Sequence, residues 1–212
     1  MIVHYVNLIG WSEIFEGGEL SLRHVYRCDS VSLKLAVALI SGKWVKRSAG
    51  TRSVDAIRAN LNDPRALFLV SENLGLDKSL ASQYVLPFAD RFDSIPAKLG
   101  EKLGSKNYRV VFLGISSPKQ NQLAGLIGEV LPSATIFCAG AAVPLAVRGE
   151  PVRLRLHEVF GRLGLEFLVF AFSNPSRGYD KLRATFIEIK RLIFDRELRR
   201  QFREFSMELV KE

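Results

Sequence analysis

The chain has 212 residues, a formal net charge of +8 and a sequence pI of about 9.7. Hydrophobic residues make up 48% and charged residues 25%, which excludes a disordered chain and allows a sizeable core. The longest apolar run, at 167–172, is far shorter than the roughly 20 residues of a membrane-spanning helix. We therefore expect a globular protein, soluble or peripheral to a membrane. Its basic surface either meets an anionic partner, such as a nucleic acid, a phosphorylated ligand or a membrane, or is a solvated surface without a partner.

Cysteine use and the start of the chain indicate the compartment. Cys28 and Cys138 stand in unrelated contexts, with neither a CxxC pair nor a Cys/His metal spacing. A reducing compartment is the simplest interpretation. The first residues, MIVHYVNLIGW, lack the basic region and long apolar core of a signal peptide. We expect a cytoplasmic protein with no metal and no cofactor.

Four short, continuously apolar segments rich in Val, Ile and Phe predict buried parallel strands. They lie at 2–9, 65–72, 108–116 and 134–140. Helical patterns lie between them, at 29–42, 53–61, 77–92 and 117–131. Alternating strands and helices predict an α/β fold over residues 1–149, with a Rossmann-like, open and mainly parallel sheet.

Particular residues mark the ends of two of these helices. Asp29 or Ser30 is expected to cap the helix at 29–42, and Gly42 to end it. For the helix at 117–131, Ser117 is the expected cap and Pro118 the expected first residue.

A helical appendage is predicted for residues 150–212. A helical hairpin is expected first, broken at Pro175. The segment 181–212 then follows one amphipathic pattern with many arginines on its polar face. The apolar positions are Leu182, Phe186, Ile189, Ile193, Leu198, Phe202, Phe205 and Leu209.

Three partners are open to this long helix: an anionic bilayer, the sheet domain or a partner subunit, and a nucleic acid. Interleaved acids and the absence of a nucleic-acid motif disfavour the nucleic acid. Packing plus peripheral contact with a membrane is the favoured interpretation, and a homo-oligomer is allowed.

One predicted strand end carries residues suited to an anionic ligand. Lys119 and Gln120 fall in the first turn of the helix that follows the strand at 108–116. Open α/β sheets bind ligands at the carboxyl ends of their strands, and helix starts favour anions. Lys119 adds a charge, while Gln120 offers a donor and an acceptor. The alternatives are a phosphate or sugar-hydroxyl site and an ordinary capped helix with a surface lysine.

The motif around this corner resembles that of a known enzyme family. LGISSPKQN at 113–121 is similar to the LGsPkQE motif of the WecG/TagA/CpsF glycosyltransferases, glycosyltransferase family 26. GLEF at 164–167 and NPSR at 174–177 resemble later motifs of that family, and VHYVN at 3–7 resembles its first strand. The family has a further conserved stretch after its first strand, and residues 27–51, RCDSVSLKLAVALISGKWVKRSAGT, resemble it.

The resemblance implies an activity. Members of this family move a sugar from a UDP-sugar to a polyprenyl-diphosphate-linked sugar, during assembly of exopolysaccharide, capsule or teichoic acid. It implies an inverting hexosyltransferase peripheral to the inner face of the cell membrane, whose arginine-rich appendage closes over the diphosphate. No D-x-D occurs in the chain, so a metal-bound diphosphate is not expected.

Residue roles follow from the same resemblance. Asp29 matches the general base that would deprotonate the acceptor hydroxyl. The positions that match donor- or acceptor-binding residues, together with the neighbouring lysine, are Asn7, Arg47, Gly50, Lys119, Gln120, Arg155 and Arg177. The arginines would stabilise the departing diphosphate, since guanidinium binds phosphate oxygens in pairs.

Several motif residues are replaced, which keeps a second interpretation open. Tyr5 stands where the family has a threonine, Ser30 where it has a glycine and Asn121 where it has a glutamate. The family's Phe-Asp pair is missing near Pro144. The alternative is a non-catalytic homologue that binds a nucleotide sugar or a protein partner.

Overall fold

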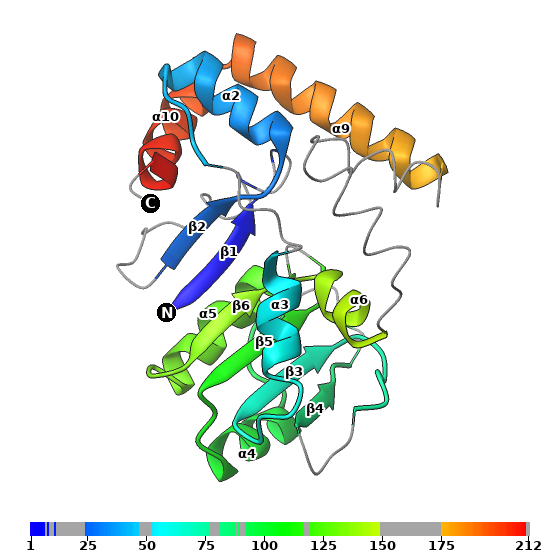
Figure 1. Ribbon diagram of the computed structural model, residues 1–212. Coiled ribbons are helices and arrows are strands. Elements are labelled where there is room, and N and C mark those ends of the chain that lie inside the picture. Colours follow the sequence, from blue (N-terminus) through cyan, green and yellow to red (C-terminus); the bar gives the residue numbers. More distant parts are fainter. Residues whose placement is uncertain are drawn as a thin grey trace. The chain divides into compact units, whose positions relative to one another are not determined.

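The computed structural model describes residues 1–6, 8, 11, 24–46, 52–76, 81–87, 89, 92–116, 119–148 and 175–210. Six strands form one parallel sheet in the order β2-β1-β6-β5-β3-β4 (Figure 1). The predicted Rossmann-like α/β sheet is thus confirmed. The strands are β1 Ile2–Val6, β2 His24–Cys28, β3 Ala66–Val70, β4 Ser82–Val85, β5 Val110–Gly114 and β6 Thr135–Cys138.

The chain divides into two compact units. The first contains Met1–His4, Ser21–Val25 and Gly50–Glu150, and the second contains Tyr5–Leu20, Tyr26–Ala49 and Pro151–Glu212. The first unit therefore holds β3 to β6, whereas the second holds the C-terminal helices.

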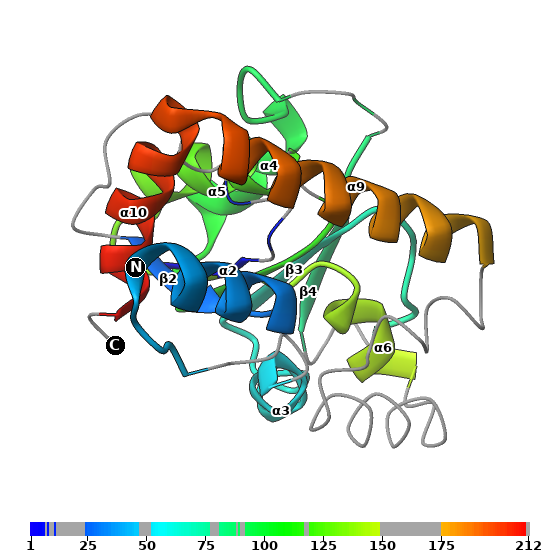
Figure 2. The same cartoon turned by 90° about the horizontal axis from the view of Figure 1, so that it is seen from above.

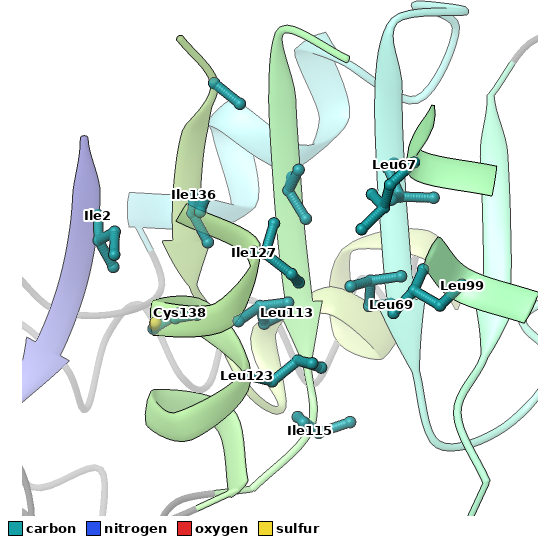
Figure 3. Packing of buried hydrophobic residues seen from close by; sticks show 14 of the residues in the cluster. Ile2, Leu67, Leu69, Leu99, Leu113, Ile115, Leu123, Ile127, Ile136 and Cys138 are labelled. Atoms are coloured by element: carbon teal, nitrogen blue, oxygen red, sulfur yellow. The ribbon is translucent and has the colours of Figure 1, made fainter. Parts of the chain in front are cut away.

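Side chains of the central strands in the first unit alternate between two faces. Leu67, Leu69 and Leu113 pack on one face under α4 (Ala97–Ser105) and α5 (Lys119–Val130), as Figure 3 shows. The opposite face lies under α3 (Arg52–Ala59) and α6 (Ala142–Arg148), as Figure 2 shows from above. A sheet covered on both faces explains why these strands are continuously apolar.

A ladder of aromatic rings crosses this second face. Phe68, Phe112 and Phe137 occupy matching register positions on β3, β5 and β6. Their rings stack in sequence, with centroids 5.1 Å and then 5.2 Å apart. The stack fixes the register of the three strands, because a one-residue slip would move each ring to the other face.

Gly114 ends β5 and lets α6 approach the sheet. A Cβ added there would lie 2.9 Å from Cβ of Val143 and 3.0 Å from a methyl of Val70. Only a residue without a side chain allows this contact. The close approach holds α6 directly behind the carboxyl end of β5.

The second unit has its own core, built on α2 (Val31–Ser41), α9 (Pro175–Phe194) and α10 (Arg196–Val210). Trp11 is fully buried there, and its ring meets those of Phe202 and Phe205 at centroid distances of 4.9 Å and 5.7 Å. Ser30 caps α2 by accepting a hydrogen bond from the Leu33 amide. Of the two expected caps, Ser30 therefore fills the role.

Three expectations about elements were wrong or incomplete. The segment 77–92 contains an edge strand, β4, where a helix was predicted; its residues pair with β3 from Leu67 to Val70. The helix predicted to start at Lys181 begins earlier, as α9, at Pro175. The single helix at 181–212 is two helices, because Asp195 separates them and accepts the Leu198 amide at the start of α10. Three elements were not predicted: β2, α4 and α6. The predicted hairpin before Pro175 lies outside the described residues.

Candidate functional site

The carboxyl ends of β5 and β6 are the candidate site of the first unit. After β5 the chain enters α5 on one face of the sheet, and after β6 it enters α6 on the other face (Figures 1 and 2). Ligand crevices of open α/β sheets form where neighbouring connections diverge in this way. The sequence motif with Lys119 and Gln120 lies at this point.

Gln120 presents a buried acceptor at this end of the sheet. The side chain is 7% exposed, and no described residue donates a hydrogen bond to its Oε1. A Cβ added at Gly140 would lie 3.6 Å from this oxygen and 3.7 Å from the carbonyl oxygen of Ile115. A buried acceptor without a donor costs about 1–3 kcal/mol, which a donor on a ligand or a water molecule would recover.

Lys119 begins α5 next to this acceptor. Its side chain is half-buried, and the first turn of the helix carries no acidic residue. The backbone dipoles and a lysine at one helix start give a positive potential suited to phosphate. Ser117 and Pro118, the expected cap and first helical residue, lie outside the described residues.

His4, for which the sequence predicted no role, lies next to the first turn of α5. His4, on β1, is 2% exposed, and its Nδ1 lies 3.2 Å from Oδ1 of Asn121 in α5. Burial, and secondarily the charge of His24, lower the pKa of His4 to about 4, against the opposing effect of the Asn121 bond. The imidazole is therefore neutral at pH 7.

Two further titratable residues of the described chain, His24 and Cys138, lie near His4. The rings of His4 and His24 lie 5.1 Å apart, and burial followed by the charge of the N-terminal amine lowers the pKa of His24. Cys138 pairs with His4 in the β1–β6 register, and burial raises the pKa of its thiol. This thiol is therefore protonated and unreactive.

Asp29 lies in the second unit, directly after β2. Its amide donates to the carbonyl oxygen of Val6 at 2.8 Å, and its side chain is half-buried. Ser30, and not Asp29, caps α2. Chemically, a half-buried carboxylate after a strand can accept a proton from a bound hydroxyl.

The remaining predicted site residues are only partly described. Arg177 falls in the first turn of α9, while its side chain lies outside the description. Asn7, Arg47, Gly50 and Arg155 also lie outside the described residues. The structure thus brings together Lys119 and Gln120 and adds His4 and Asn121 to them, all within the first unit.

Sequence reasoning missed the pair of His4 and Asn121 because neither residue belongs to a motif that indicates a functional site. His4 interrupts an otherwise apolar strand, which was the only available signal. In the described part of the chain, no three His, Cys, Asp or Glu side chains gather as metal ligands. Comparison with protein-family models, curated proteins and solved structures found no match.

Proposed function

We propose that the protein is an inverting, metal-independent glycosyltransferase that moves a hexose from a UDP-sugar to a polyprenyl-diphosphate-linked sugar in surface polysaccharide assembly. The observation that carries this proposal is the buried, unsatisfied acceptor of Gln120 at the carboxyl ends of β5 and β6. The motif resemblance around 113–121 supports the choice of donor.

Each described residue has a defined task in this scheme. Gln120 Oε1 accepts a hydrogen bond from an N–H of the base or a hydroxyl of the sugar. Lys119 and the start of α5 attract the diphosphate. Gln120 thereby provides orientation, while Lys119 provides charge. The matching positions Asn7 and Gly50 would line the same donor or acceptor.

The transfer itself needs a base and a stabilised leaving group. The acceptor oxygen attacks the anomeric carbon while Asp29 takes the hydroxyl proton. The bond from that carbon to the diphosphate oxygen breaks, and its electron pair leaves with UDP. The arginines that match the family, Arg47, Arg155 and Arg177, would stabilise this charge.

A lipid-linked acceptor requires work at a membrane surface, and α9 offers a face suited to it. Its exposed apolar side chains are Tyr179, Leu182, Phe186, Ile187, Ile189, Ile193 and Phe194. By contrast, the apolar side chains of α10 that share the predicted pattern are buried in the core. The peripheral contact predicted for the whole segment 181–212 is therefore assigned to α9 alone.

The charged residues beside this face of α9 favour an anionic partner. Exposed cations Arg183, Lys190 and Arg191 accompany the apolar stripe, and the exposed acids described beside it are Asp180 and, at its end, Asp195. A hollow of about 530 Å³ at the end of α9 is lined by Ile187, Lys190, Arg191, Phe194 and Asp195. Apolar insertion beside phosphate-binding cations fits an anionic lipid bilayer, on the inner face of the cell membrane. No helix among the described residues is long and apolar enough to cross a bilayer.

The decisive experiment titrates the protein with UDP-sugars and GDP-sugars by calorimetry and then assays sugar transfer to a polyprenyl-diphosphate-linked acceptor. We expect selective UDP-sugar binding and transfer. The Asp29→Asn variant should bind UDP as the wild type does and transfer no sugar. UDP binding without transfer by the wild type would establish the non-catalytic alternative, and turnover by Asp29→Asn would remove Asp29 from its role.

A further inference from the structure

The first turn of α5 is tied to β1 by a side-chain hydrogen bond. Nδ1 of His4 and Oδ1 of Asn121 are 3.2 Å apart, and the imidazole is almost entirely buried. An amide oxygen can only accept, so the neutral ring carries its proton on Nδ1 and donates it to Asn121. The bond joins a sheet strand to the residue that follows Gln120.

A second contact joins β1 to α5 at Gly128. A Cβ added at Gly128 would lie 3.1 Å from Cδ1 of Ile2, so this strand and helix are closely packed there. Asn121 and Gly128 are seven residues apart, about two helical turns, and so share one face of α5. The contact at Gly128 is apolar and tolerates sliding, whereas the bond at Asn121 is directional.

The acceptor of Gln120 lies beside the segment that follows β6. His4 pairs in register with Cys138 on β6, and Gly140 follows two residues later beside Oε1 of Gln120. Any shift of the first turn of α5 away from β1 therefore changes the distance from Gln120 to Gly140. A displacement of about 1 Å can cost a site much of its binding or activity.

We propose that His4 is a positioning residue, which through Asn121 fixes the first turn of α5 so that Gln120 meets the nucleotide sugar. His4 itself does not touch the ligand. The identity of the ligand rests on the proposed function, while the fixing of α5 does not. Because its pKa is low, the His4 ring is neutral at pH 7. The titratable groups described near it are His24, whose pKa is lowered by burial and then by the N-terminal amine, and the protonated thiol of Cys138.

Calorimetry with UDP and hydrogen exchange of the apo protein test this proposal together. His4→Phe and Asn121→Leu should each weaken UDP binding about tenfold, since each breaks one partly buried hydrogen bond. The double variant should also lose about tenfold, because both changes break the same bond. His4→Gln, which keeps an N–H donor, should recover most of the affinity. Exchange at Gln120 to Gln122 should accelerate in His4→Phe and return toward the wild-type rate in His4→Gln.

Ile2→Val is the matched control, because it loosens the same strand–helix contact without touching a hydrogen bond. It should lower the melting temperature and leave UDP affinity within about twofold. The positioning role is overturned if the losses of UDP affinity in the two single variants multiply in the double variant. It is also overturned if His4→Gln does not restore the affinity. If His4→Phe does not fold, Asn121→Leu makes the same test from the helix. A wild-type chain that binds no UDP overturns the proposed function, and unchanged exchange in the first turn of α5 then overturns the positioning role separately.

Discussion

Trp11 donates its indole N–H to Oε1 of Glu188 at 2.9 Å, and the two residues are 0% and 6% exposed. Oε2 of the same carboxylate accepts from Arg191 at 3.1 Å. The core of the second unit therefore contains a charged group whose two oxygens are both bonded, which is the condition for burying a carboxylate without a large penalty.

Removing this carboxylate should destabilise the protein strongly. Glu188→Ala leaves the buried indole N–H of Trp11 without its acceptor, and we expect a loss of about 2–3 kcal/mol in the free energy of unfolding, measured in urea. Glu197→Ala is the control, since Glu197 pairs with Arg200 at the same three-residue spacing on the surface. It should change stability very little. Equal losses in the two variants would contradict a special role for the buried bond.

The fold could be predicted where the chain is buried on both sides. Leu67, Phe68 and Phe112 lie in strands whose every residue is apolar, and such runs predict central parallel strands without knowledge of their partners. The edge strand β4 could not be predicted in this way. It is half-exposed and has no continuous run of apolar residues. Its pairing with β3 therefore decides its conformation.

The exposed stripe of α9 leads to a prediction about membranes. Phe186→Ser should reduce co-sedimentation with phosphatidylglycerol vesicles at least tenfold, because burying a phenylalanine in lipid contributes about 1.5–3 kcal/mol. Phe186 is 70% exposed, so the protein should keep its stability. Met207→Ser on α10, where Met207 is 47% exposed, is the control and should bind normally.

Two results would redirect this interpretation of α9. Binding to neutral phosphatidylcholine vesicles as strong as to anionic ones would remove the part assigned to Lys190 and Arg191. A wild-type dimer that Phe186→Ser converts to a monomer, without vesicle binding by either, would make the face a contact between two copies of the chain.

The buried histidine predicts how stability depends on pH. The pKa of His4 is about 4 in the folded protein and 6.5 in the unfolded chain, so the unfolded state binds more protons between these values. The His4 contribution is therefore complete above about pH 6.5 and is lost as the pH falls through 4. It amounts to about 3 kcal/mol, and His24 acts in the same direction.

Urea titrations between pH 7.5 and 5 measure this dependence before most carboxylates titrate. The His4→Gln variant cannot take up the proton, so its free energy of unfolding should fall less than that of the wild type over this range. Parallel curves for the two proteins would show that His4 titrates at its ordinary pKa.

The site was predictable in part, for a physical reason. A serine and a proline after a buried strand, followed by Lys119 and Gln120, indicate that a helix starts near the carboxyl end of that strand. The structure has α5 there. The tie between His4 and Asn121 spans 117 residues of sequence and depends on β1 lying beside β6. A single sequence contains no local signal of such a neighbour, so this half of the site required the fold.

The unsatisfied oxygen of Gln120 predicts that one substitution will improve stability and impair binding. Gln120→Leu removes a buried acceptor that has no donor, so the free energy of unfolding should rise by about 1 kcal/mol, while UDP binding should weaken at least tenfold. Gln122→Leu, two residues on, is the matched control, because Oε1 of Gln122 accepts from the Phe92 amide at 3.3 Å. That variant should lose stability, since it leaves the Phe92 N–H without its acceptor. Urea denaturation and calorimetry on the two variants measure both effects. A loss of stability in both, with UDP affinity unchanged in Gln120→Leu, would show that Gln120 serves the fold alone.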